Sequence, residues 1–91
     1  MPYIPKDQRE SLDPTIISLA CRILAHDELE RAGVLNYAIS SLLSRLSDGE
    51  GLNYRNINRM IGVLECAKLE LYRRLASPYE DQKMKANGDV F

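Results

Sequence analysis

The segment Leu35–Leu46, LNYAISSLLSRL, carries the clearest structural pattern in the chain and decides the fold. Its apolar residues recur every three or four positions, which places them on one face of an α-helix. They are Leu35, Ala38, Ile39, Leu42, Leu43 and Leu46. The pattern predicts a helix over about residues 32–47. The sequence SDGEG at residues 47–51 then predicts a break, because it combines two glycines with short polar residues.

A shorter helix is predicted before this segment. Pro14 fits the first turn of a helix, and Asp13 can cap it. Four apolar residues then share one face: Ile16, Leu19, Ala20 and Ile23. The face is lost at Asp27 and Glu30, so we expect this helix to end near residue 25 or 26. Residues 26–31 are predicted to form a charged turn or a short helix.

A long third helix is predicted over about residues 53–77. Its apolar stripe consists of Ile57, Met60, Ile61, Leu64, Ala67, Leu71 and Leu75. Pro78 is expected to end it, because proline lacks the N–H that a helix interior needs. A short helix over residues 79–85 and a turn at Asn87-Gly88 would follow. The expected fold is an all-α bundle of three to four helices, with an extended N-terminal arm over residues 1–11 and a single helical domain over residues 12–91.

Composition limits the class of protein. The chain has 91 residues, of which 45% are hydrophobic and 27% are charged, as in an ordinary globular domain. A single core is marginal at this length, which favours self-association into a homo-oligomer. The net charge of −1 argues against a dedicated nucleic-acid binder, because neutralising phosphates requires an excess of lysine and arginine.

No motif for catalysis, metal binding or a cofactor is present. Cys21, Cys66 and His26 do not have the spacing of a zinc site, and no phosphate-binding glycine loop or nucleophile motif occurs. Glu65 and Glu70 are five residues apart on one helix, so their carboxylates do not converge on a metal ion. We therefore expect a protein that is not an enzyme. Without a membrane-length apolar run or a secretory signal, a cytoplasmic location is expected.

One stripe of the third helix has the chemistry of a binding pocket. It contains Tyr54, Asn58, Ile61, Glu65, Lys68 and Tyr72 at helical spacing, beside the apolar stripe. Tyrosine rings stack on planar ligands, and the amide, carboxylate and ammonium groups can form hydrogen bonds to their edges. The alternative is that Glu65 and Lys68 only pair with each other, while the tyrosines lie at the edge of the core.

Three further arginine and tyrosine residues extend this candidate site. Arg73 and Arg74 can hold phosphate or carboxylate groups, or they can pair with nearby acidic residues. Tyr79 lies just after Pro78 and adds another ring. On the opposite face, Gly62 and Cys66 are small enough to admit another helix, which is either the first helix or a second copy of the chain.

Several blocks of the sequence resemble a widespread family of short proteins of unknown function from tailed bacteriophages, bacteria and metagenomes. These blocks are YIPKDQR at residues 3–9, GVLNYAI at 33–39, NRMIGVLECAK at 58–68, LELYRR at 69–74, PYEDQK at 78–83 and NGDVF at 87–91. Many relatives carry an aromatic residue where Leu71 stands. The resemblance implies no established catalytic residue.

The phage association of that family implies a functional class. Short oligomeric phage proteins with aromatic pockets between subunits resemble proteins that sequester the cyclic or ADP-ribose-type nucleotides used as messengers in bacterial defence. The resemblance therefore implies a protein that binds a small nucleotide-like ligand. One alternative is an adaptor that binds another protein through the third helix and the C-terminal tail. Another is nucleic-acid binding through Arg55, Arg59, Arg73 and Arg74.

Overall fold

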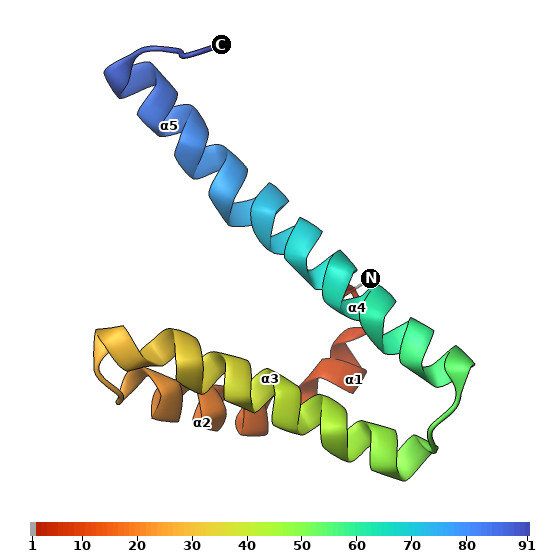
Figure 1. Cartoon of the computed structure of the whole chain (residues 1–91). Coiled ribbons are helices and arrows are strands. Elements are labelled where there is room, and N and C mark those ends of the chain that lie inside the picture. Colours follow the sequence, from red (N-terminus) through yellow and green to blue (C-terminus); the bar gives the residue numbers. More distant parts are fainter. Residues whose placement is uncertain (1) are drawn as a thin grey trace. The chain divides into compact units, whose positions relative to one another are not determined.

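The computed structural model describes residues 2–91, and within this range it contains helices and loops but no strand (Figure 1). The predicted all-α class is therefore confirmed. The chain divides into two compact units. We call residues 3–57 the hairpin unit, and Pro2 together with residues 58–91 the long-helix unit. Each unit is described by itself.

The hairpin unit begins with two short helices. The helix α1 spans Lys6–Glu10, inside the segment that was predicted to be extended. The helix α2 spans Asp13–Leu24 and has Pro14 in its first turn, as predicted. The predicted cap is absent, because no side chain accepts a hydrogen bond from the N-terminal amides of α2. The observed end at Leu24 agrees with the predicted end near residue 25 or 26.

The helix α3 spans Glu28–Glu50, so it is longer at both ends than the predicted range of residues 32–47. Glu28 and Glu30 lie in its first turn, where negative charge is favoured by the partial positive charge of a helix N-terminus. Residues 26–31 were predicted to form a charged turn or a short helix. This prediction is wrong from Glu28 onward, because these residues are the first turn of α3. Only residues 25–27 form the turn between α2 and α3.

Arg31 closes this turn by binding the end of α2. Its Nε donates a hydrogen bond of 3.1 Å to the His26 carbonyl oxygen, and its Nη2 donates one of 3.1 Å to the Leu24 carbonyl oxygen. The last carbonyl groups of a helix have no partner within the helix, so a side chain that binds them stabilises the turn. Arg31 is half-buried as a result of this position.

Small and branched residues form the seam along which α2 packs against α3. Ile23 from α2 and Val34, Ala38 and Ser41 from α3 are half-buried there. A second face of α3 is free of this contact. Its residues Leu35, Ile39 and Leu46 are between 40% and 48% exposed.

Gly51 ends α3 with a φ of 92°, a left-handed conformation that glycine adopts without strain. The predicted break was placed too early, because residues 47–50 are helical. Asn53 then starts the next helix: its Oδ1 accepts a hydrogen bond of 2.9 Å from the backbone N–H of Asn56. The Asn56 side chain binds back to the Gly51 carbonyl oxygen at 3.0 Å.

From Tyr54 onward the backbone is helical without interruption to Asn87. The helix α4 spans Tyr54–Leu71, a π-helical turn η1 spans Tyr72–Ala76, and α5 spans Ser77–Asn87 (Figure 1). The predicted stop at Pro78 is therefore wrong. Gly88, with a φ of 95°, ends α5, whereas Asn87 of the predicted turn still belongs to the helix.

The π-turn explains why the helix continues through Pro78. In a regular α-helix the ring of Pro78 would clash with the Arg74 carbonyl group, four residues earlier. In η1 the Ser77 N–H binds the Tyr72 carbonyl oxygen, five residues earlier. This wider turn makes room for the ring and leaves no N–H required from Pro78.

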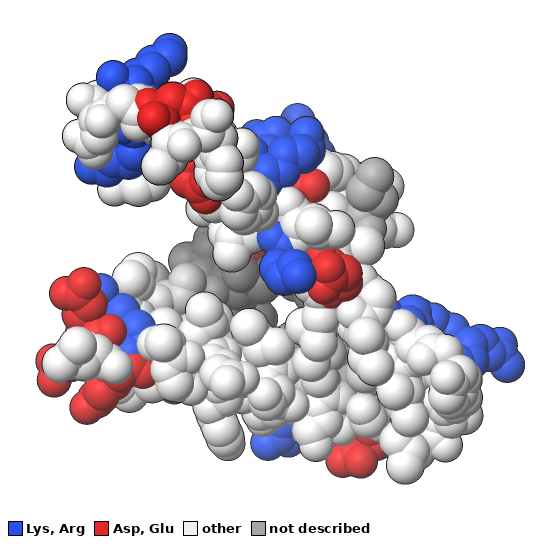
Figure 2. All heavy atoms as spheres, turned by 45° about the horizontal axis from the view of Figure 1, so that its top comes forward, with Lys and Arg blue, Asp and Glu red and all other residues white. Residues whose placement is uncertain are grey.

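No residue within 2–91 is buried. In the long-helix unit, Ile61, Leu64, Leu71 and Leu75 of the predicted core stripe are between 41% and 64% exposed. Figure 2 shows that the charged side chains gather in separate clusters and leave broad uncharged areas between them. Each unit therefore presents apolar surface that its own residues do not cover.

Candidate functional site

The residues of the predicted binding stripe all lie on the continuous helix α4–η1–α5. They are Tyr54, Asn58, Glu65, Lys68, Tyr72, Arg73, Arg74 and Tyr79. The 18 residues of α4 alone extend for about 27 Å at 1.5 Å per residue. A ligand of nucleotide size cannot contact both ends of this stripe on one helix, so the stripe is not a single pocket within one chain.

Because the stripe lies beside the apolar residues, its side chains would be expected to be partly buried, but they are more exposed than that. Tyr54 is 80% exposed and Tyr72 is 54% exposed. The alternative that these tyrosines lie at the edge of a hydrophobic core therefore does not hold within either unit. Both aromatic faces remain accessible to another molecule.

Two charged residues in the middle of the stripe bind each other. Lys68 Nζ lies 3.1 Å from Glu65 Oε1, one helical turn away, and both side chains are exposed. This is the alternative that the sequence left open for the pair. An exposed ion pair of this kind contributes about 0–1 kcal/mol, so it opens readily for a stronger partner.

Arg73 is engaged with a carboxylate in the same way. Its Nη2 donates a hydrogen bond of 2.7 Å to Glu70 Oε1, and the Glu70 side chain is only 24% exposed. The alternative of ion pairing is therefore confirmed for Arg73. A phosphate at Arg73 would have to compete with this carboxylate.

Tyr72 and Glu80 meet across the π-turn. Tyr72 Oη donates a hydrogen bond of 3.4 Å to Glu80 Oε2. This hydrogen bond and the negative charge of Glu80 raise the pKa of the Tyr72 phenol above its ordinary value, because both favour the protonated form. Tyr79, the residue before Glu80, has Lys83 Nζ 5.5 Å from its ring centroid.

The face that contains Gly62 and Cys66 is open. No atom lies within 4 Å of the place that a Cβ at Gly62 would occupy. A shallow hollow of about 370 Å³ lies over this face and is also lined by Pro2, Arg59 and Val63. Cys21 and Cys66 are both free thiols with exposed side chains.

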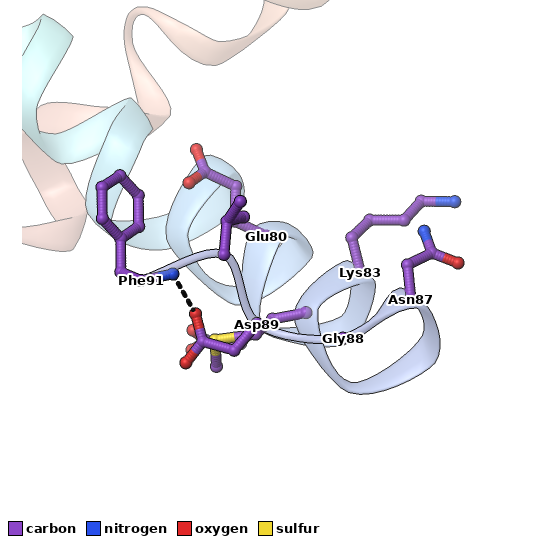
Figure 3. Close-up of a pocket in the computed structure, with 9 residues that line it drawn as sticks. Glu80, Lys83, Asn87, Gly88, Asp89 and Phe91 are labelled. Carbon is purple, nitrogen blue, oxygen red and sulfur yellow. Dashed lines mark hydrogen bonds between the residues drawn. The ribbon is translucent and has the colours of Figure 1, made fainter.

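A second hollow, of about 390 Å³, lies between the C-terminal tail and α5 (Figure 3). The tail is held in a turn by the Phe91 N–H, which donates a hydrogen bond of 2.9 Å to Asp89 Oδ1. Figure 3 shows Phe91 and Glu80 toward one end of the hollow and Lys83 and Asn87 toward the other. Acidic residues predominate here, so the hollow does not have the charge to bind a phosphate.

A third hollow, of about 400 Å³, follows the seam between α2 and α3, and the sequence analysis missed it. We call it the hairpin groove. It is lined by Leu19, Arg22, Ile23, His26, Val34, Tyr37, Ala38, Ser41, Leu42 and Arg45. Arg22 comes from α2, whereas Tyr37 and Arg45 come from α3. No local motif connects residues so far apart in sequence, and only the register of the hairpin brings them together.

Two further properties of the described residues concern metals and membranes. Among residues 2–91, no three histidine, cysteine, aspartate or glutamate side chains are grouped so that they could hold a metal ion. In the same range, every helix is too short or too polar to cross a lipid bilayer.

The fold defines the class of protein. It is a small all-α protein with a helical hairpin and one long helix that contains a π-turn. The chain belongs to the family described as Domain of unknown function (DUF6899), which matches residues 1–90. Neither the comparison with curated proteins nor the comparison with solved structures gave a match.

Proposed function

We propose that this chain is a non-enzymatic, homo-oligomeric protein that binds and sequesters a small nucleotide-like ligand. The observation that supports self-association is that no residue within 2–91 is buried, although both units carry apolar stripes. A folded protein of this size is stabilised mainly by removing such stripes from water. In this proposal, another copy of the chain covers the apolar stripes that each unit leaves exposed.

The long-helix unit supports the same proposal. Within its unit, the helix α4–η1–α5 has no second helix to pack against. Most of the stability of a protein helix comes from packing of its apolar face rather than from helix propensity. Pairing between copies through Leu64 and Leu71 would supply that packing.

The aromatic and cationic side chains support the choice of ligand. Because the stripe is too long for one small molecule, its tyrosines and cations act in combination with surfaces of another copy. In this proposal the protein is encoded by a phage, and the ligand is an immune messenger such as a cyclic nucleotide or an ADP-ribose derivative. Holding the messenger would inhibit bacterial anti-phage defence in the cytoplasm of the host, without any reaction.

Light scattering and calorimetry test the two parts of the proposal separately. Multi-angle light scattering at micromolar concentration should give a mass of at least two chains, and a monomer would contradict self-association. Isothermal titration with cyclic di-GMP and ADP-ribose should show binding by at least one of them. The absence of binding by both would count against the nucleotide-sequestering function.

The second candidate function is that of an adaptor that binds another protein through α4 and the C-terminal tail. The observation that favours it is the exposure of Val90, which is 92% accessible, next to Phe91 at the end of a folded tail. A variant without residues 89–91 should then lose a partner that the full chain retains from phage-infected cells. Identical partners for both chains would remove this candidate.

A further inference from the structure

The hairpin groove combines an apolar floor, one aromatic ring and two cationic side chains. We propose that it is a binding site for an organic phosphate that carries a planar ring, with Arg22 and Arg45 holding the phosphate groups and Tyr37 stacking on the ring. This inference rests on the proposed function and deepens it, because it assigns ligand binding to residues outside the predicted stripe. All of these residues lie within the hairpin unit.

The two arginines that line the groove form no ion pair with a carboxylate among the described residues. Among the described residues, no carboxylate lies within ion-pair distance of Arg22 or Arg45, whereas Lys68 and Arg73 on the long helix are paired with Glu65 and Glu70. The carboxylates nearest in sequence to the lining are Asp27, beside His26, and Asp48, three residues after Arg45, and neither forms an ion pair with Arg22 or Arg45 among the described residues. Glu30 Oε2 lies 3.4 Å from His26 Nδ1. Two unpaired arginines that line one groove are complementary to an anion with more than one charged group.

The remaining lining favours a planar ligand over a simple inorganic ion. Leu19, Ile23 and Leu42 give the groove an apolar surface, and the groove volume of about 400 Å³ is within the range of small-molecule sites. Tyr37 is 73% exposed, so its ring is available for stacking. A base or similar ring would cover these apolar atoms while its phosphates reach the arginines.

Single substitutions in the full-length protein test this site. Isothermal titration with ADP-ribose and with cyclic di-GMP would compare the unchanged protein with R22A, R45A and Y37A. Because each arginine supplies a charge-assisted hydrogen bond, R22A and R45A should each weaken binding at least about tenfold. Y37A should weaken binding several-fold. K6A, which removes an exposed cation on α1, serves as the control and should leave affinity unchanged.

The outcomes separate this inference from the proposed function. Binding of either nucleotide that R22A and R45A leave unchanged would overturn the groove as the site but would keep the sequestering function. No binding of either nucleotide to the unchanged protein would overturn both. Inorganic pyrophosphate should bind more weakly than ADP-ribose, and equal affinity would contradict the contact with Tyr37. Circular dichroism melts equal to that of the unchanged protein would show that the variants are folded.

Discussion

The hairpin unit and the long-helix unit differ in how they use the apolar faces of their helices. In the hairpin unit, α2 and α3 pack along a seam of small residues, and Arg31 binds the carbonyl groups at the turn. In the long-helix unit, a longer helix has no second helix within its unit and keeps its leucines exposed. One unit of this chain therefore contains a packed pair of helices, whereas the other unit leaves the apolar side chains of its helix exposed within the unit.

The largest expected effect comes from placing a charge on the unpartnered face. If the chain assembles as proposed, Leu64→Glu should raise the dissociation constant of that homo-oligomer at least about 100-fold, because burying an unpaired carboxylate in an apolar interface is unfavourable. Light scattering over a dilution series measures this change.

The control for this prediction is Gln82→Glu, which adds the same charge to the exposed, polar helix α5. It should leave the mass unchanged. Equal dissociation by both variants would show that net charge, and not the Leu64 face, governs assembly.

The second effect concerns the π-turn of the long helix. Pro78→Ala restores a backbone N–H and removes the ring that a regular helix cannot hold, so the helix should gain about 2 kcal/mol of stability. Tyr72 and Glu80 would then no longer face each other, because one residue fewer per turn rotates α5 by about 100°. Thermal unfolding and the Tyr72 pKa measure the two consequences. A stabilised helix in which the Tyr72 pKa stays raised would contradict the link between Pro78 and the π-turn.

The third effect concerns the hairpin unit, in which Arg31 binds the turn between α2 and α3. Arg31→Ala should lower the free energy of unfolding of the hairpin by about 1–2 kcal/mol, because the Leu24 carbonyl at the end of α2 and the His26 carbonyl in the turn lose their side-chain donor. Urea unfolding followed by circular dichroism measures the loss.

Arg31→Lys is the conservative comparison for this position. Lysine keeps the charge but lacks the planar fork that reaches two carbonyl groups, so it should restore only part of the stability. Full recovery by lysine would show that charge at the end of α2 matters more than the two hydrogen bonds.

The smallest effect is a shift in one titration. Glu80→Gln removes the negative charge beside the Tyr72 phenol, so the pKa of Tyr72 should fall toward its ordinary value. In the unchanged protein the raised pKa means that the Tyr72–Glu80 contact is fully present below the ordinary phenol pKa, about 10, and is lost as the pH rises through the raised value. Ultraviolet difference spectra with Tyr72→Phe as the reference identify the signal. An unchanged pKa in Glu80→Gln would contradict the contact.

The sequence predicted those features that depend on local chemistry. The all-α class, the end of α5 at Gly88 and the start of the long helix near Asn53 all follow from residues that act on their immediate neighbours, whereas the break predicted over residues 47–51 narrows to Gly51. The stop at Pro78 failed because the rule assumes a regular α-helix, whereas five residues before the proline widen into a π-turn. The candidate binding stripe on the long helix stays a prediction. The hairpin groove was missed because Arg22 and Arg45, 23 residues apart in sequence, line one hollow only through the packing of α2 against α3.

The wide turn at Tyr72–Ala76 limits any coiled coil that this protein forms. A supercoiled partner follows a heptad pattern, in which each contact depends on a constant rotation between successive residues. One extra residue in the turn offsets everything after Ala76 by about 100°, so a partner helix that follows Ile57, Leu64 and Leu71 faces a different side of the rod beyond this point. Knobs-into-holes packing along α4 should therefore stop at the π-turn. The helix α5 is then available to bind a different surface.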